Sequence, residues 1–322
     1  MRKYGTNILP LILCVWLISG CTPAPVDAIR LGTNVWAGYE PLYLARSFGW
    51  LDEPKVKLIE FTSTTSVLRA MRDHTLEAAA MTLDEALILY QDDPDIRIVL
   101  VMDESTGADA LLARPGIANL HALKGKRIAA ETTALGAYMI SRALDHGQLQ
   151  LSDITLISLP ANEHAAAFRK GRVDAVVTFE PVKSELLHDG AELIFDSSHI
   201  AGEIVDVLVV HEEIVDKHRQ RLIKLLGIWF QATRYLAEHP DDAATRMQPR
   251  VKLPVSEVLA QYEGLKLPAM DENLAILAGG ENSKLLKSAH KMADLMIDRK
   301  LIRKHPESSI MDASLLRSLE NN

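Results

Sequence analysis

Hydrophobic and polar residues alternate along the first third of the chain in a way that predicts strands separated by helices. Short apolar runs bounded by polar residues indicate buried strands, and apolar residues three or four positions apart indicate amphipathic helices. Val67, Leu68 and Met71, for example, lie on one side of the helix expected at 64–72. Alternating strands and helices are typical of an α/β fold with mostly parallel sheets. The other elements expected here are strands at 29–33, 56–61, 78–81, 96–102 and 110–113, and a helix at 41–48.

A second series of the same kind begins after the break at Arg114-Pro115-Gly116. The stretches Thr64–Asp84 and Glu163–Glu180 both run from a helix through an acidic residue and a small apolar strand to a threonine, an apolar residue and an acid. This repetition predicts two lobes of similar build, although any two α/β units share part of such a pattern. From Glu212 the pattern is helical almost to the end. The elements expected from Lys126 onward are strands at 126–130, 154–159, 173–178, 192–195 and 205–210, and helices at 134–146, 163–170 and 219–238.

Polar and aromatic side chains gather in the loops that follow the expected strands. Ligands of open α/β sheets bind beyond the carboxyl ends of the strands, so two facing lobes would form a cleft lined by these loops. Trp36 and Tyr39 suit a flat or apolar ligand, and the hydroxyl cluster at 62–66 is larger than one helix cap needs. Further candidates in these loops are Thr82, Asp84, Ser105, Gly107, Asp109, Glu131, Tyr138, Thr178, Phe179, Glu180 and Asp206.

The candidate loops are rich in acids and hydroxyls and contain almost no Arg or Lys. An anionic ligand such as a sulfonate usually needs arginines or several helix N-termini. The side chains of these loops therefore favour a neutral or amine-bearing ligand, including one with an aromatic ring. Taken one at a time, each acid is also compatible with an ordinary surface charge.

The N-terminus has the pattern of an export signal. Arg2 and Lys3 precede an apolar run at 8–18, which has the length of a signal-peptide core and is too short to span a bilayer. The run ends in Ile18-Ser19-Gly20-Cys21, which resembles a bacterial lipobox. Residues 1–20 are therefore expected to be a lipoprotein signal peptide, Cys21 to carry acyl chains such as palmitate, and residues 21–28 to form a tether in the periplasm or at the cell surface. The alternative is a plain secretory signal with a chance cysteine.

The positions of the cysteines and the net charge exclude some classes of function. Cys14 lies within the expected signal and Cys21 would be lipidated, so the mature domain would lack disulfides, cysteine nucleophiles and cysteine metal sites. A net charge of -8 with no basic block argues against nucleic acid as a partner. The sequence has no GxSxG elbow, no phosphate-cradling P-loop and no GxGxxG after the first strand. No cofactor is expected, and an enzyme is the weaker hypothesis.

The 11 histidines are scattered along the chain. The nearest approach to a metal motif is His211-Glu212 with His218, whose spacing does not match the HExxH pattern on one helical face. These three residues are interpreted as solvated helix residues, and no metal site is expected.

Several segments, taken in order, resemble the NMT1/THI5-like family, which includes nitrate-, taurine- and aliphatic-sulfonate-binding proteins of ABC importers. The resemblance implies a type II periplasmic-binding fold, with two lobes of mostly parallel sheets and a cleft between them. Residues 29–113 and 207–322 would form lobe 1, and residues 114–206 would form lobe 2. The segments that carry the resemblance are RLGTNVWAGY (30–39), PLYLA (41–45), GW (49–50), STGAD (105–109), LKGKRIA (123–129) and FEP (179–181).

The same resemblance implies that ligand closes the lobes and that the closed form docks on a membrane permease. Sulfonate and nitrate binders of the family carry more basic or amide groups than are found here, whereas binders of thiamine-type pyrimidines use aromatic and acidic groups, which fits better. The ligand-binding residues expected from the loops and the resemblance together are Asn34, Trp36, Tyr39, Thr62, Ser63, Thr82, Asp84, Ser105, Asp109, Glu131, Tyr138 and Glu180.

The leading hypothesis is a lipid-anchored, monomeric solute-binding protein that captures a small polar molecule, amine-bearing or heterocyclic, and delivers it to an ABC importer. The alternative is a sensory protein of the same fold that presents its ligand to a membrane receptor. A THI5-like synthase comes third, because such enzymes resemble suicide enzymes with histidine and cysteine chemistry, and the expected mature chain has no cysteine.

Overall fold

A computed structural model describes residues 28–132 and 135–321 of the chain. The expected signal peptide, the lipidation site Cys21 and the tether as far as residue 27 lie outside the described residues. Strands and helices alternate from β1 (Ile29–Thr33) to β10 (Val205–His211), and helices dominate after β10. The α/β fold class predicted from the alternating pattern is confirmed. No helix in the described part of the chain is both long and apolar enough to cross a membrane.

The first sheet combines β1 and β10 with β2 (Val56–Glu60), β3 (Ala78–Thr82), β4 (Ile96–Ser105) and the short β11 (Leu265–Lys266). Its six strands lie in the order β11-β4-β10-β3-β1-β2. β1 pairs in parallel with β2 and β3. β10 runs antiparallel between β3 and β4, so these two strands point the same way.

The second sheet contains β5 (Asp109–Ala113), β6 (Arg127–Ala130), β7 (Thr155–Ser158), β8 (Ala175–Phe179) and β9 (Glu192–Asp196). Its five strands lie in the order β7-β6-β8-β5-β9. β6 pairs in parallel with β7 and β8, whereas β5 runs antiparallel between β8 and β9. The strands of each sheet therefore point mostly one way, and the reversed ones include β10 in the first sheet and β5 in the second.

The strands β5 and β10 lie next to the connections between the two sheets. The sequence assigned residues 110–113 to lobe 1, but β5 pairs with β8 and β9 in the second sheet. An apolar run shows that a strand is buried without showing which sheet it joins, because pairing partners are distant in sequence. We propose that the first crossing between the lobes lies at 106–108, and the other boundaries expected for the lobes stay predictions.

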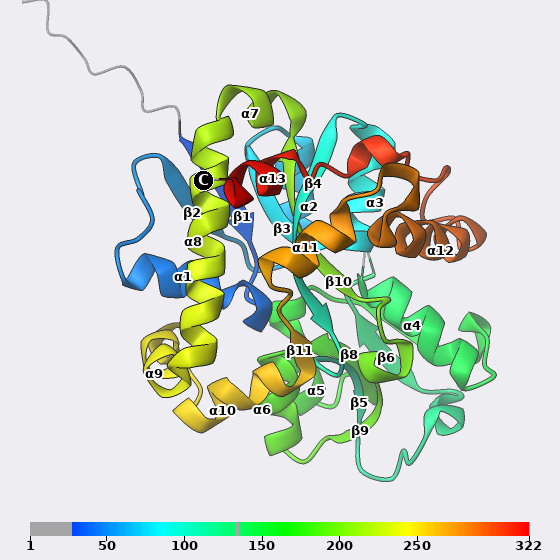
Figure 1. The fold of residues 1–322 in the computed structure, drawn as a ribbon. Coiled ribbons are helices and arrows are strands. Elements are labelled where there is room, and N and C mark those ends of the chain that lie inside the picture. Colours follow the sequence, from blue (N-terminus) through cyan, green and yellow to red (C-terminus); the bar gives the residue numbers. More distant parts are fainter. Residues whose placement is uncertain (1–27, 133–134, 322) are drawn as a thin grey trace, which may run out of the picture.

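Helices surround both sheets (Figure 1). The long helix α8 runs along one side of the molecule and packs against α1 and the C-terminal α13. The second sheet lies in the lower half of the view with α4, α5 and α6. The helices are α1 (Glu40–Ser47), α2 (Thr64–Arg72), α3 (Leu83–Asp92), α4 (Leu135–His146), α5 (His164–Arg169), α6 (Val182–His188), α7 (Glu212–Lys217), α8 (Arg219–Glu238), α9 (Pro240–Val251), α10 (Val255–Ala260), α11 (Met270–Leu277), α12 (Lys284–Asp298) and α13 (Ser314–Glu320).

Local sequence explains where the helices beside the first sheet begin. Pro41 occupies the first turn of α1, where a missing N–H is tolerated. Ser63 caps α2 by accepting a hydrogen bond from the N–H of Ser66. At the start of α3, the Glu85 side chain accepts a hydrogen bond from the N–H of Thr82 over 3.0 Å, as in a capping box. These caps fix the loops after β2 and β3 at one edge of the sheet.

The helical pattern predicted for the C-terminal third is correct for α8, whose bounds match the expected 219–238. It is wrong for β11, which pairs with β4 at Ser105 and Glu104. This strand has only two residues, so its hydrogen bonds to β4 and not any local pattern decide its conformation.

The central strand β3 of the first sheet consists mostly of small side chains. All five residues of β3, Ala-Ala-Ala-Met-Thr, are buried. Small side chains in a central strand let the covering helices approach closely. α3 packs on both β3 and β10, and its acidic N-terminus is thereby held against the end of the sheet.

Candidate functional site

A small cavity lies where elements of both sheets meet. It is lined by residues of the first sheet and its loops, by Asp109 and Phe179 from the strands β5 and β8 of the second sheet, and by Leu135 at the start of α4. The free volume within it is about 10 Å³, about what one water molecule needs. A larger ligand therefore enters only if the lobes or the lining side chains move. The lining residues are Asn34, Trp36, Tyr39, Thr64, Thr82, Asp109, Leu135, Phe179 and Asp206.

Two aromatic rings close one side of the cavity. Trp36 follows β1, and its ring meets the edge of Phe179 at the end of β8, with ring centroids 5.7 Å apart and planes at 88°. This edge-to-face contact joins the two lobes. Trp36 Nε1 also donates a hydrogen bond to Asp103 Oδ2 over 3.1 Å, which fixes the indole ring.

The cross-strand register places polar groups in one row at the cavity. Thr82 of β3 lies opposite Asp206 of β10, and Asp206 lies opposite Asp103 of β4. The hydroxyl of Tyr39 donates a hydrogen bond to Asp206 Oδ1. The row could be read only in part from the sequence, because Asp206 and Thr82 are more than a hundred positions apart.

Five buried carboxyl groups meet beside the cavity, and we call them the buried acid cluster. Asp109 and Asp206 line the cavity, and Asp103 contacts the indole of Trp36 directly behind it. None of the five side chains is more than 2% exposed. Four of them carry an oxygen atom that has no hydrogen-bond partner in the described part of the chain. The members are Asp84, Glu85, Asp103, Asp109 and Asp206.

Burial raises the pKa of every member of the cluster, because a carboxylate loses its hydration in the protein interior. The pKa of Asp84 rises to about 6, that of Glu85 to about 8, and those of Asp103 and Asp109 to about 7. The pKa of Asp206 rises well above its ordinary value, first through burial and then through the charge of Asp103. The cluster is thus held at high free energy when all its members are ionised.

The nearest basic side chain is already engaged. Lys183 lowers the pKa of Asp109, but its ammonium group donates to Gly107 O over 2.9 Å and lies 3.4 Å from Glu180 Oε1. No Arg or Lys belongs to the described lining of the cavity. The cluster therefore presents negative charge that the protein itself balances only in part.

Seven of the twelve residues expected to bind ligand do not line the cavity. Asp84 belongs to the buried acid cluster, and Ser63 caps α2. Thr62 is exposed, and its neighbour Thr64 lines the cavity instead. A β-strand followed by a helix cap turns successive side chains in different directions, which the hydroxyl run alone did not reveal.

The remaining four are buried and form hydrogen bonds with other parts of the protein. Ser105 Oγ lies 2.7 Å from Ser197 Oγ. Tyr138 donates to Glu203 Oε2 over 2.8 Å, and burial raises the pKa of Tyr138. Glu180 accepts a hydrogen bond from the N–H of Ser184 over 3.1 Å.

Glu131 connects the two lobes. Its Oε1 accepts hydrogen bonds from the N–H of Thr65, over 2.8 Å, and from the Thr65 hydroxyl at the start of α2. Its Oε2 accepts from the N–H of Ala161 in the second lobe over 3.0 Å. Glu131 thus acts as a latch between the two lobes, with both oxygens used.

Sequence reasoning missed two members of the acid cluster. Asp103 follows directly on the apolar run expected as a strand at 96–102, and β4 extends to Ser105. Glu85 occupies the third position of α3, where a capping box is a sequence signal. An acid immediately beyond a buried strand was therefore the available clue for Asp103, and helix capping explained Glu85 without implying a site.

Gly38 allows the indole of Trp36 to reach Asp103. A Cβ atom at this position would lie 1.9 Å from Asp103 Oδ2 and 2.4 Å from Trp36 Nε1. We expect Gly38→Ala to break this hydrogen bond and to lower the free energy of unfolding by about 1–3 kcal/mol, as overpacking does in a filled core. Urea unfolding monitored by tryptophan fluorescence measures the change. The matched variant is Gly227→Ala, where a Cβ atom would meet only Leu319 Cδ1 at 3.4 Å, and it should not lower the free energy of unfolding.

A family model described as the NMT1-like family matches residues 22–248 of the chain. The chain belongs to the NMT1-like family. The family expected from the sequence is thereby confirmed, and the fold agrees with it.

Two curated relatives carry the same printed name, "Putative aliphatic sulfonates-binding protein". The one from Bacillus subtilis (strain 168) is 24% identical over 259 residues, covering 74% of this chain and 76% of the relative. The one from Escherichia coli (strain K12) is 22% identical over 314 residues and covers 94% of both chains. Both are named as binding proteins and not as enzymes.

The fold is shared with a solved structure of a binding protein. The alkanesulfonate-binding protein SsuA from Xanthomonas axonopodis pv. citri, bound to MOPS, superposes with a TM-score of 0.75 at 20% identity. The match covers 89% of this chain and 97% of that one. The NMT1-like chain described here therefore has the fold of a solute-binding protein along nearly its whole described length.

Proposed function

We propose that this protein binds a cationic, amine-bearing solute between its lobes, outside the cytoplasm, and delivers it to an ABC importer. The solute-binding role rests on the family and on relatives named as binding proteins. The class of ligand rests on one observation, the buried acid cluster beside the cavity.

The acid cluster favours a cation for electrostatic reasons. Each ionised carboxylate that is buried without a partner carries a large desolvation penalty. An ammonium or amidinium group placed at Asp109 and Asp206 would offset that penalty and could donate to Asp109 Oδ2, which has no hydrogen-bond partner among the described residues. A sulfonate at the same place would add a like charge at close range, which disfavours binding.

The aromatic side chains suit the same ligand. Trp36, Tyr39 and Phe179 line the cavity together with the two acids. The face of an indole or phenol ring attracts a cation, and this contact strengthens when water is excluded. A ligand with a positive charge next to a flat or apolar body would use both parts of the site.

A sulfonate is the second candidate, favoured by the names of the relatives from Bacillus subtilis and Escherichia coli. The identity to those proteins is 24% and 22%, so the side chains of the site need not be shared. A sulfonate would be held by the hydroxyl and amide groups of Asn34, Thr64 and Thr82, provided that the acids are protonated. Sulfonate binding should therefore be much stronger at low pH, where the acids are protonated.

Titration with both classes of ligand tests the proposal. Primary amines, guanidines and aminopyrimidines form one panel, and aliphatic sulfonates and taurine form the other. We expect the first panel to raise the melting temperature and change tryptophan fluorescence at about pH 7.5, since ligand that binds only the folded state stabilises it. Saturable binding of a sulfonate at that pH, with no response to any cation, would overturn the cationic assignment and leave the binding role intact.

Lobe movement accompanies binding in this proposal. The cavity has room for about one water molecule, so an amine with several heavy atoms needs a more open state to enter. Opening would break the latch between Glu131 and Thr65 and the ring contact between Trp36 and Phe179. We therefore expect ligand binding to change the radius of gyration measured by small-angle X-ray scattering.

We also propose that the mature protein is held at a membrane by acyl chains on Cys21. The support is the lipobox-like sequence before Cys21. Cys21→Ala is expected to move most of the protein from the membrane fraction to the soluble extracytoplasmic fraction and to abolish incorporation of labelled palmitate. Equal membrane association of both forms would contradict the anchor, and Cys14→Ala is the matched control because Cys14 lies within the expected signal.

A further inference from the structure

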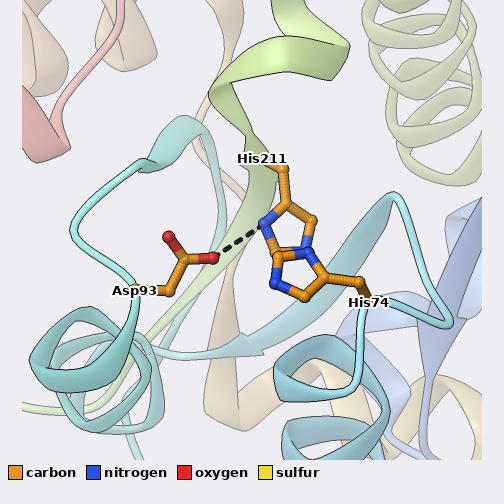
Figure 2. Close-up of side chains that lie close together, drawn as sticks. All are labelled: His74, Asp93 and His211. Atoms are coloured by element: carbon orange, nitrogen blue, oxygen red, sulfur yellow. Dashed lines mark ion pairs between the residues drawn. The ribbon is translucent and has the colours of Figure 1, made fainter.

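Two histidines and an aspartate converge at the end of the first sheet that is opposite the cavity. His74 follows α2, Asp93 follows α3, and His211 is the last residue of β10. Figure 2 shows these side chains pointing toward one another from three separate segments. One ligand atom from each lies within 4.8 Å of the others. The five-residue step along β10 from Asp206 to His211 separates this group from the cavity by roughly 16 Å.

His211 is not the solvated helix residue that its sequence context predicted. It is 4% exposed because β10 extends to it and pairs it with Ile96 of β4. The same prediction is wrong for His218, which is buried before α8, and correct for the exposed Glu212 in the first turn of α7. The sheet register, and not the helical pattern, decides where these side chains lie.

The ring nitrogens of His211 lack good hydrogen bonds within the described part of the protein. Nε2 is buried and has no hydrogen-bond partner among the described residues. Nδ1 lies 2.9 Å from Asp93 Oδ2, yet this oxygen accepts no hydrogen bond from any described group. Buried polar atoms are normally hydrogen-bonded. A nitrogen and an oxygen that lie this close without the geometry of a hydrogen bond are arranged like two ligands of one cation.

His74 brings a second imidazole to the same point. Its ring centroid is 4.6 Å from that of His211, with the planes at 27°. Its backbone has a φ of 49° at the C-terminal end of α2, where glycine is the preferred residue because a side chain is disfavoured there.

We propose that His74, Asp93 and His211 bind a divalent first-row transition metal ion such as zinc. Imidazole nitrogen and carboxylate oxygen are ligands that zinc accepts at about 2.0–2.2 Å. In a tetrahedral site such ligands lie about 3.3 Å apart, within the range from 2.9 Å between Nδ1 and Oδ2 to the 4.8 Å limit of the group. Three protein ligands leave one position for water or for a group from a partner.

The bound metal would join the end of β10 to the segments that follow α2 and α3. The exposed His74 can rotate to complete the site, whereas His211 is fixed by β10. The neighbouring charges do not block metal binding, since the nearby Arg97 is paired with Glu212 over 2.7 Å. The site is independent of the solute cavity, so its failure would leave the proposed transport role untouched.

The test is zinc binding by the purified protein after treatment with a chelator. Calorimetry with ZnCl2 and the visible spectrum with CoCl2 report stoichiometry and coordination. We expect one tightly bound equivalent, a cobalt spectrum typical of four or five ligands, and a higher melting temperature with metal. Absence of saturable zinc binding, or a purely six-coordinate cobalt spectrum, would overturn the proposal.

Variants separate this site from other histidines. His74→Gly removes one ligand and also relieves the positive φ, so we expect the metal-free variant to melt no lower than the parent while zinc affinity falls about tenfold or more. Asp93→Asn should weaken zinc to a similar degree. The control is His199→Ala, which removes an exposed histidine 3.2 Å from Asp196 and should bind zinc as the parent does. Unchanged zinc affinity in His74→Gly would place the metal elsewhere and refute the site.

Discussion

Replacement of Asp109 by Asn is expected to weaken binding of a cationic ligand about a hundredfold or more. Asp109 lines the cavity and is 2% exposed, and its Oδ2 has no hydrogen-bond partner in the described part of the chain. Loss of one partner from a buried ion pair costs about 3–5 kcal/mol of interaction free energy. A loss of about 1.4 kcal/mol of binding free energy lowers the affinity tenfold. Calorimetric titration with the best amine found for the parent protein measures the change.

The same substitution carries an opposite expectation for anions. The side-chain amide of Asp109→Asn is neutral, so the variant loses one negative charge from the lining, and any weak sulfonate binding should tighten while amine binding weakens. The control is Asp174→Asn, which makes the same chemical change in an ion pair with Arg127 that lies outside the cavity lining. An amine affinity that is equal in Asp109→Asn and in the parent would remove the acid cluster from the ligand site.

Replacement of Asp103 by Asn is expected to stabilise the ligand-free protein at about pH 8 by about 2–4 kcal/mol, an effect that shrinks steadily as the pH is lowered toward about 5 and ends below about pH 4. Burial raises the pKa of Asp103 to about 7 from its ordinary value of 3.8. Asparagine has no charge to bury, and its side-chain oxygen can still accept the hydrogen bond from Trp36 Nε1. Urea unfolding at a series of pH values measures the difference.

The sign of this pH dependence follows from proton binding. Between the ordinary pKa and the raised one, the folded protein binds a proton at Asp103 that the unfolded chain has released. Stability from this group is therefore complete below about pH 4 and is lost as the pH rises through about 7. The other members of the cluster have raised pKa values too, so the ligand-free parent should be more stable at about pH 5 than at about pH 8.

A variant with the opposite electrostatic situation serves as the control for this series. The ion pair and hydrogen bonds with Arg127 lower the pKa of Asp174 to about 2, so this carboxylate is ionised in both folded and unfolded protein above about pH 5. The effect of Asp174→Asn on stability should therefore be constant over the same pH series. A stability gain of Asp103→Asn that is equally constant over this range would contradict ionisation as its cause.

The two predictions describe one property of the acid cluster. Carboxylates that destabilise the ligand-free protein at neutral pH become partners when a cation binds, so free energy lost in folding is recovered in binding. Stability and affinity should then move in opposite directions across substitutions of the cluster, as expected where a functional site is not optimised for stability. Asp103→Asn, which stabilises, should also weaken the amine ligand.

The sequence identified most of the cavity lining. Asn34, Trp36, Tyr39, Thr82 and Asp109 were expected to bind ligand, and Phe179 and Asp206 were named as candidates in the loops. These assignments held because a residue directly after a buried strand has few directions open to it. The candidate Thr62 is exposed and Glu131 joins the lobes through Thr65 instead of lining the cavity, because side-chain direction in a loop depends on the cap that follows.

Hydrophobic periodicity by itself determined the α/β class, the strands β1 to β10 and the long helix α8, since burial of an apolar face is a local requirement of the residue order. It did not identify the helices α3 and α6. Acid-rich loops without Arg or Lys determined the expected charge of the ligand. Only the tertiary structure decided that β5 belongs to the second sheet, that Asp103 and Glu85 join Asp206 in one cluster, and that His211 is buried beside His74. Strand pairing places β5, Asp103, Asp206 and His211, and helix packing brings Glu85 and His74 beside them. Both join residues that are far apart along the chain.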